Sequence, residues 1–466
     1  MNSAVRSALS RAARVPCALP GDPGYETARA VWNTDVRRAP LAVVRPATVA
    51  GVRGAVRFAA DRGLPVAVRG GGHSLAGFGT ADDAVVLDLG ALAGIDVDAR
   101  GRTLTVGGGA VWGQVDEATQ RAGLAVTGAD VPSVGVGGTT VGGGFGWLHR
   151  AAGMTCDNLL SAEVLTAAGE ILTAAPDSHS DLYWALRGGG GNYGVVTAFR
   201  FRLRPVATVV SGTVLHAFDR AADVLLHYQD VCDRAPDHLA LRATLLTAPP
   251  APFVPPELRG GPVVMIGVAD FAPSHGSERL IAELCGFGTP PVADVRPRPY
   301  LELQQPPGRT VEAMRAHGHS AFLGRLDERL VKVLVETAGQ PPSPLAMIQL
   351  QLLGGVAGRV PADATPVPHR DAVQLLGVNA LAARQNRTAG LAGWTKAAAD
   401  AVRPYVRGGP YVNFVTGEET ADQIRTAYGA DTYDRLVAVK SVHDPENVFR
   451  FNANIVPRPL RPPNPN

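Results

Sequence analysis

The sequence is poor in cysteine, in lysine and in long apolar runs. Its four cysteines show no CxxC spacing, which argues against a disulfide framework and a zinc site, so no metal is expected. Only three basic residues are lysines, and the formal net charge of +2 gives no reason to expect a nucleic-acid partner. No apolar run reaches membrane-spanning length, and residues 1–20 lack a signal-peptide core. We therefore expect a cytoplasmic protein that binds no membrane.

The chain of 466 residues exceeds what one hydrophobic core supports, which predicts two or three domains. Glycine runs mark residues 1–207. Over 208–407 the glycine runs vanish and prolines cluster, and short strands alternate with helical stretches, which predicts a separate α+β domain. Residues 408–466 return to a glycine- and asparagine-rich composition.

Local patterns predict the main helices and strands. The expected helices cover 25–32, 48–63, 111–122, 181–186, 278–285 and 421–428, and the expected strands cover 66–68, 84–89, 104–106, 195–205, 263–269 and 346–353, with two more within 158–173. In the strand 195–205, phenylalanines alternate with arginines, so one face is apolar and the other is charged.

The stretch RGGGHS (69–74) follows the predicted strand 66–68. Three consecutive glycines remove every side chain from one tight turn, so backbone N–H groups can converge on an anion. His73 follows the glycines directly and lies within reach of whatever the loop holds.

A second glycine-rich stretch is PSVGVGGTTVGGGFG (132–146), with seven glycines in twelve residues, and it predicts a long loop against a flat or anionic ligand. A dinucleotide-binding Rossmann loop needs the pattern GxGxxG. Gly135 and Gly137 begin that pattern, but residue 140 is threonine, which disfavours a Rossmann fold.

Five motifs together resemble one known family. They are RGGGHS, PSVGVGGTTVGGGFGWL, RGGGGNYGVVTAF (187–199), YVNF (411–414) and DPENVFRFNANI (444–455). Their sequence and order resemble the berberine-bridge-enzyme-like FAD-linked oxidases, which have the vanillyl-alcohol-oxidase-type fold. YVNF and the missing second cysteine are similar to the bacterial hydroxynicotine-oxidase branch, and flavin oxygenases of polyketide pathways are also similar. The resemblance implies an α+β fold with a two-part FAD-binding domain (1–207 and 408–466) and an inserted substrate domain (208–407), an antiparallel sheet with helices.

The resemblance implies FAD bound covalently through His73, whose neutral imidazole is nucleophilic. The alternative is a histidine that only hydrogen-bonds the loop. The resemblance places the other FAD contacts at Arg69, Gly70, Gly71, Gly72, Ser74, Ser133, Val134, Gly137, Gly138, Thr139, Gly142, Gly143, Gly144, Gly146, Trp147, Asp157, Asn158, Gly194, Val195, Val196, Tyr411, Asn413 and Asn452.

Some family members attach the flavin a second time, through a cysteine. Val131 stands at that position and Thr139 replaces an accompanying histidine, so we predict a single attachment. Cys156 lies elsewhere, and we expect a buried small residue there. Val134 occupies the position that gates dioxygen in the family, and a valine there favours an oxidase, although valine is also a common core residue.

The resemblance assigns catalytic positions to Asn379, Tyr411 and Phe414. The family's catalytic tyrosine is replaced by Phe414, and Asn379 stands near the position of a carboxylate, so both usual bases are missing. Three interpretations stay open. An amine could bind deprotonated and need little base, another residue such as His317, His319 or Tyr300 could serve, or oxygen chemistry could proceed without a strong base.

The sequence therefore predicts an FAD-dependent oxidase that transfers hydride from a small secondary-metabolite amine or alcohol to flavin and then to dioxygen. A flavin-dependent oxygenase of a polyketide-type pathway and a non-catalytic protein that sequesters a metabolite are the alternatives. The expected partners are the small-molecule substrate and dioxygen, and the expected oligomeric state is a monomer or a homodimer.

Overall fold

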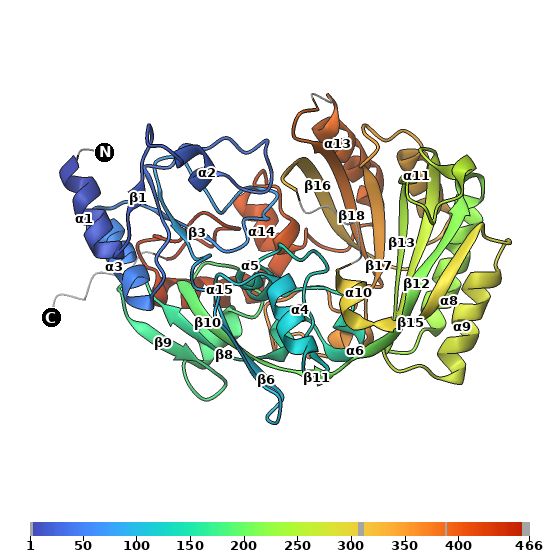
Figure 1. Ribbon diagram of the computed structural model, residues 1–466, viewed down its shortest axis with the longest axis horizontal. Coiled ribbons are helices and arrows are strands. Elements are labelled where there is room, and N and C mark those ends of the chain that lie inside the picture. Colours follow the sequence, from blue (N-terminus) through green and yellow to red (C-terminus); the bar gives the residue numbers. More distant parts are fainter. Residues whose placement is uncertain (1–2, 306–311, 387–388, 459–466) are drawn as a thin grey trace.

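Two lobes make up the chain (Figure 1), and the computed structural model describes residues 3–305, 312–386 and 389–458. The first lobe begins with a four-stranded sheet in the order β1 (Cys17–Ala18), β2 (Ala42–Val44), β4 (Val85–Asp88) and β3 (Val66–Arg69), with α1 (Ser3–Ala13), α2 (Tyr25–Arg29) and α3 (Val49–Ala60) beside it. Strand β4 runs parallel to both β2 and β3. The predicted apolar face of α3, with Val52 and Val56, is fully buried. This packing fixes the end of β3, where the RGGGHS loop begins.

A five-stranded antiparallel sheet completes the first lobe, in the order β5 (Ile95–Asp98), β6 (Thr103–Gly107), β10 (Val195–Arg202), β8 (Leu159–Leu165) and β9 (Ile171–Ala174). In β10, Phe199 and Phe201 are buried whereas Arg200 and Arg202 are exposed, as the alternation predicted. The remaining elements of this lobe are β7 (Leu124–Ala125), β11 (Arg204–Pro205), α4 (Trp112–Gln120), α5 (Val136–Val141), α6 (His149–Ala152), α7 (Ser180–Ala185), α14 (Ala421–Tyr428) and α15 (Ala430–His443).

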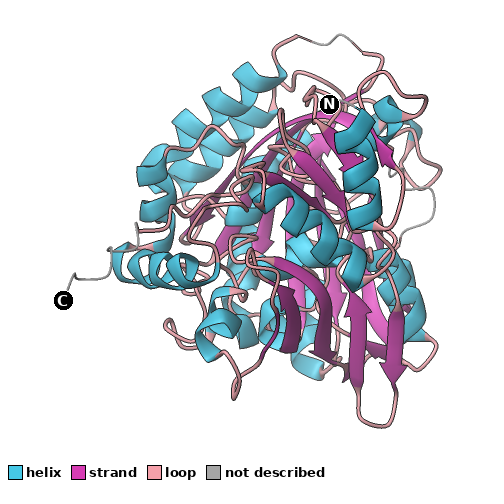
Figure 2. Cartoon of the chain, turned by 90° about the vertical axis from the view of Figure 1, so that its left-hand side faces the viewer, coloured by secondary structure: helices cyan, strands magenta, loops and turns pink. Residues whose placement is uncertain are grey.

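The second lobe is a seven-stranded antiparallel sheet, which confirms the expected fold class. Its order is β15 (Val292–Pro299), β12 (Thr208–Ala217), β14 (Pro262–Asp270), β13 (Leu239–Thr247), β17 (Met347–Leu352), β18 (Gln374–Ala383) and β16 (Met314–Leu323). Helices α8 (Ala221–Arg234), α9 (His275–Gly286), α11 (Glu328–Ala338) and α13 (Leu391–Val402) pack on one face and form one core with it. Figure 2 shows strands and helices in packed layers. The other face of the sheet carries the candidate substrate residues.

The C-terminal segment returns to the first lobe, where Tyr428, Leu436 and Ile455 share a core with Phe199. Buried Lys440 on α15 donates to Asn192 O (2.8 Å), Phe449 O (3.0 Å) and Asp444 Oδ2 (2.6 Å). These bonds hold the closing DPENVF turn. The domain limits at 207 and 407 stay a prediction, and residues 1–2 and 459–466 of the expected two-part domain lie outside the described residues.

The prediction of a continuous loop over 132–146 is wrong, because α5 occupies its centre. Thr139 and Thr140 donate their hydroxyls to Gly135 O (2.9 Å) and Val136 O (2.7 Å), one helical turn back. Val136 and Val141 are buried in the core of the first lobe. Tertiary packing therefore overrides the low helix propensity of glycine here.

Across the described ranges, every helix is too short or too polar to cross a membrane. All four cysteines are free.

Candidate active site

The two glycine-rich stretches meet backbone to backbone. A Cβ on Gly71 would lie 2.3 Å from Gly135 N, and one on Gly108 would lie 2.1 Å from Val196 O. Side chains at Gly71 and Gly108 would separate these segments. The glycines after β3, those after β6 and those around α5 therefore pack closely together and form one glycine-rich surface.

This surface has open positions and unpartnered polar groups. A Cβ on Gly138 or Gly191 would meet nothing within 4 Å. Ser133 Oγ and Asn452 Oδ1 are buried without a hydrogen-bond partner in the described part of the chain. Buried polar atoms are rarely left unpaired, so an outside ligand with polar groups fits here. FAD, with its phosphates and hydroxyls, supplies such groups.

His73 directly follows the glycines of the RGGGHS loop, and its ring is neutral. Burial lowers the pKa of its imidazole to about 4. Its ring stacks on Trp32 with centroids 5.1 Å apart. Neither ring nitrogen of His73 hydrogen-bonds any other described residue. The alternative role, a histidine that only hydrogen-bonds the loop, therefore has no such bond in support. A neutral imidazole with a free nitrogen is suited to nucleophilic attack.

Asn33 ties the His73 loop to the second lobe. Its Nδ2 donates to Leu75 O (2.8 Å) and to Ala316 O on β16 (2.9 Å), and its Oδ1 accepts from Ala316 N (3.1 Å). Because these groups are buried, the bonds fix the loop relative to the sheet.

Tyr411 and Asn413 lock the C-terminal segment onto the glycine-rich stretch. Tyr411 OH accepts from Gly144 N (2.8 Å) and Asn413 Nδ2 (2.9 Å), and Asn413 Nδ2 also donates to Thr139 O (3.2 Å). A Cβ on Gly142 would lie 1.9 Å from Asn413 Oδ1, so only glycine fits there. Burial raises the pKa of Tyr411, which keeps the phenol protonated. It is therefore a poor base.

Phe414 ends the short helix η5 (Val412–Phe414) and is 40% exposed. Its ring packs edge-on against Tyr411 at 5.1 Å between centroids. No phenol stands at this position.

Asn379 lies on β18, opposite Gly318 of β16 and Met347 of β17. A Cβ on Gly318 would lie 3.5 Å from Asn379 Oδ1 and 2.7 Å from Leu75 of the His73 loop. The structure therefore brings Asn379 beside that loop. Strands β13, β16, β17 and β18 contain no aspartate or glutamate, so they offer no carboxylate base.

The three weaker base candidates lie elsewhere. His317 and His319 point to the face of the sheet opposite Asn379, because side chains alternate along β16. His317 Nε2 lies 3.2 Å from Asp35 Oδ2, and burial lowers the pKa of His319. Tyr300 is buried beside Phe271, away from the glycine-rich surface, and burial raises its pKa.

Several predicted FAD contacts are bonded within the protein. Arg69 donates to Ala30 O (3.1 Å) and pairs with Asp88 (3.0 Å). Asp157 accepts two bonds from Arg370, at 2.8 and 3.0 Å. These side chains brace the loops, and their contact with FAD stays a prediction.

The other predicted contacts are spread around the same surface. Asn158 donates to Ala152 O and Met154 O. Trp147 lies against β14, where a Cβ on Gly267 would come within 2.9 Å of its ring, and the Arg242 guanidinium lies 4.0 Å from its ring centroid. The remaining members occupy the RGGGHS loop (Gly70, Gly71, Gly72, Ser74), α5 and its flanks (Ser133, Val134, Gly137, Gly138, Thr139, Gly142, Gly143, Gly144, Gly146), the approach to and start of β10 (Gly194, Val195, Val196) and the C-terminal segment (Asn452).

Cys156 is fully buried, as expected for a small core residue. Burial raises the pKa of its thiol, which makes it a poor nucleophile. Val134 is half-buried and packs on the core of the first lobe.

Sequence reasoning missed His149 and the glutamines of β17. His149 Nδ1 lies 2.6 Å from Gly146 O and its Nε2 lies 3.0 Å from Leu352 O, so it joins the glycine-rich stretch to the sheet. Gln349 and Gln351 alternate with apolar residues in β17. That period of two was the signal that could have placed them on the polar face of a strand.

Comparison with known proteins shows which family this chain resembles. The FAD binding domain family matches residues 40–175, and the family described as "Berberine and berberine like" matches residues 410–456. The chain is 29% identical over 457 residues to (R)-6-hydroxynicotine oxidase of Paenarthrobacter nicotinovorans, with 94% of this chain and 96% of that protein covered. The chain thus resembles the berberine-bridge-enzyme-like FAD-linked oxidases over nearly its whole length.

Solved structures agree with this resemblance. The chain resembles 6-hydroxy-D-nicotine oxidase from Arthrobacter nicotinovorans with a TM-score of 0.84 and 27% identity, over 95% of this chain and 98% of that one. An uncharacterized FAD-linked oxidoreductase of Bacillus subtilis is 29% identical over 94% of this chain and 95% of its own length. Glucooligosaccharide oxidase from Acremonium strictum shares the fold at a TM-score of 0.85 and 22% identity, covering 98% and 100% of the two chains.

Proposed function

We propose that this oxidase holds FAD through one covalent bond to His73 and oxidises a small amine or alcohol, with dioxygen as the final acceptor. The observation that carries the proposal is the neutral, unbonded His73 ring at the end of the RGGGHS loop. The described glucooligosaccharide oxidase is named for an 8α-N1-histidyl, 6-S-cysteinyl FAD, which supports a histidine as the attachment point. Val131 and the buried Cys156 support a single bond.

Bound FAD would accept hydride and, once reduced, pass electrons to dioxygen. The chain's own residues would bind and orient the substrate. Asn379, Gln349 and Gln351 offer neutral amides, which hydrogen-bond a substrate without taking its proton. Because the central strands carry no carboxylate, the substrate class that fits best is an amine that binds deprotonated. A relative and a solved structure both carry the name of a hydroxynicotine oxidase, which supports an amine.

We propose that the two lobes have different roles. Residues 1–207 and 408–466 would bind FAD, and residues 208–407 would supply the substrate face. We retain a monomer or a homodimer as the expected assembly.

The test uses the purified yellow holoprotein and a panel of small amines and matched alcohols. Anaerobic addition of a substrate should bleach the flavin, and air should restore the colour with release of hydrogen peroxide. The kcat/KM for an amine should rise with pH along the ionisation of the substrate, because the central strands β13, β16, β17 and β18 carry no carboxylate that could act as a base. Labelled oxygen appearing in the product would instead identify an oxygenase. A ligand that binds tightly while no compound reduces the flavin would identify a sequestering protein.

A further inference from the structure

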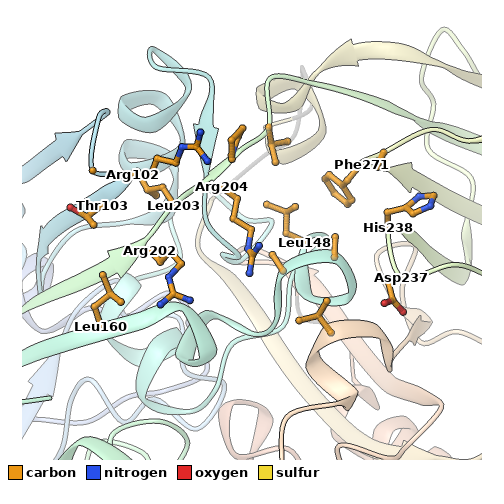
Figure 3. A pocket seen from close by; sticks show the side chains of 17 residues that line it. Arg102, Thr103, Leu148, Leu160, Arg202, Leu203, Arg204, Asp237, His238 and Phe271 are labelled. Atoms are coloured by element: carbon orange, nitrogen blue, oxygen red, sulfur yellow. The ribbon is translucent and has the colours of Figure 1, made fainter. Parts of the chain in front are cut away.

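A cleft lies where the two lobes join, and none of the predicted FAD contacts or catalytic positions lines it. Its volume is about 660 Å³. Figure 3 shows Arg102, Arg202 and Arg204 on the side of the first lobe, with Asp237 and Phe271 on the side of the second. Its volume lies in the range of small-molecule sites.

Strand pairing brings three arginines to the first-lobe side of the cleft. Arg202 stands opposite Thr103 in the register of β10 with β6, and Leu203 N donates to Arg102 O at 2.8 Å. Arg202 and Arg204 flank Leu203, so they point to the same side of the chain. Both are exposed, as is Arg102.

None of these three arginines has an acidic partner within the described ranges. The one acidic residue that lines the cleft, Asp237, is paired with Arg359 at 2.5 Å. Like charges on one wall repel, and within the described residues these three positive charges have no acidic partner. A bound anion would relieve that repulsion, and the guanidinium fork matches a carboxylate in shape.

The rest of the wall is apolar. Leu148 just before α6, Leu203 after β10, Phe271 and Val356 line the cleft between the arginines and the second lobe. An exposed arginine adds little free energy to an ion pair, so charge alone gives weak binding. Apolar contact supplies the additional free energy. An inorganic anion would pair with the arginines but would leave the apolar side chains in contact with water.

We propose that this cleft binds a small organic carboxylate with an apolar body, with the carboxylate at Arg102, Arg202 and Arg204 and the body against Leu148 and Phe271. The proposal concerns a site separate from the flavin and stands whether or not the proposed function holds.

The test measures binding of 2-naphthoate and of the neutral 2-naphthamide to the holoprotein by calorimetry. Naphthoate should bind more tightly than the amide, and added salt should weaken only naphthoate. Arg204→Gln should weaken naphthoate about fivefold, the upper range for one exposed ion pair. The triple variant R102Q/R202Q/R204Q should bind both probes alike.

The matched control is Arg200→Gln, because Arg200 lies on β10, is equally exposed and does not line the cleft. It should bind naphthoate as the wild type does. Equal affinity of the two probes for the wild type, or an equal loss in the Arg200 and Arg204 variants, would overturn the proposal. Binding that perturbs the flavin spectrum and survives the triple substitution would place the probe in the active site and overturn it as well.

Discussion

The imidazole of His73 stacks on the indole of Trp32, with ring planes inclined by 23°. Together with the loop, this indole keeps water from the imidazole, and burial lowers the pKa of His73 to about 4. The ring is therefore neutral across the range in which an ordinary histidine becomes protonated.

Replacing Trp32 by alanine should return the pKa of His73 toward its ordinary value of 6.5. At pH 5.5 the variant would then be about nine-tenths protonated, so attachment of added FAD to the apoprotein should slow about tenfold, whereas the wild type changes little. Flavin fluorescence in denaturing gels measures the attachment. Trp394→Ala, on α13 of the second lobe, is the control. An equal rate in the two variants at pH 5.5 would contradict the role of Trp32.

Replacing Tyr411 by phenylalanine should leave Gly144 N–H without its buried acceptor. An unsatisfied buried donor costs about 1–3 kcal/mol. The melting temperature of the variant should therefore fall, and FAD should be released more readily before it is attached. Phe414→Leu, which changes the exposed neighbouring ring, should lower the melting temperature less. The assignment fails if Tyr411→Phe melts as the wild type does.

Asp116 on α4 is buried beside Gln304, whose Nε2 lies 3.3 Å from its carboxylate. Burial raises the pKa of Asp116 to about 8, from 3.8. The folded state therefore holds a proton that the unfolded chain has lost, and stability falls as pH rises from about 4 to about 8.

Asp116→Asn should remove this loss. Its gain in stability over the wild type should be small at pH 4 and on the order of 5 kcal/mol at pH 8. Melting temperatures across this range measure the gain. Glu117→Gln, at the exposed neighbouring position, should show no such trend. A gain that is independent of pH would contradict the assigned protonation.

Lys440 and Asp444 form an i,i+4 pair with both side chains fully buried, whereas Lys332 and Glu336 form an i,i+4 pair on the surface. Lys440→Met leaves the Asp444 carboxylate buried without its cation, which costs about 3–5 kcal/mol. Lys332→Met should cost less than about 1 kcal/mol. Thermal unfolding of the two variants compares the pairs, and equal losses would refute the buried role of Lys440.

Local motifs predicted the parts of the fold that follow from local rules. The strand before RGGGHS and the alternation of Phe199 and Phe201 with arginines are found as β3 and β10. Helix α5 was missed because glycine disfavours helix unless packing holds it, as Val136 and Val141 do. Helix α15 was missed because Lys440 occupies a buried position and interrupts its apolar pattern.

The candidate site depends on contacts between distant segments. His73 could be singled out because its motif is continuous in the sequence. The alternation within β17 puts Gln349 and Gln351 on one face of that strand, but only the register of β13, β17 and β18 brings this face to the side that holds Asn379. The link from His149 to Leu352 spans the two lobes, and no local pattern contains it.

The bond between His73 and FAD is tested most directly by acid precipitation of the purified holoprotein, followed by peptide mapping. In the wild type the flavin should stay with the precipitated protein and map to His73 alone. In His73→Ala it should pass into the supernatant. Flavin released from the wild type, retained in the variant or found on Cys156 would contradict the single attachment at His73.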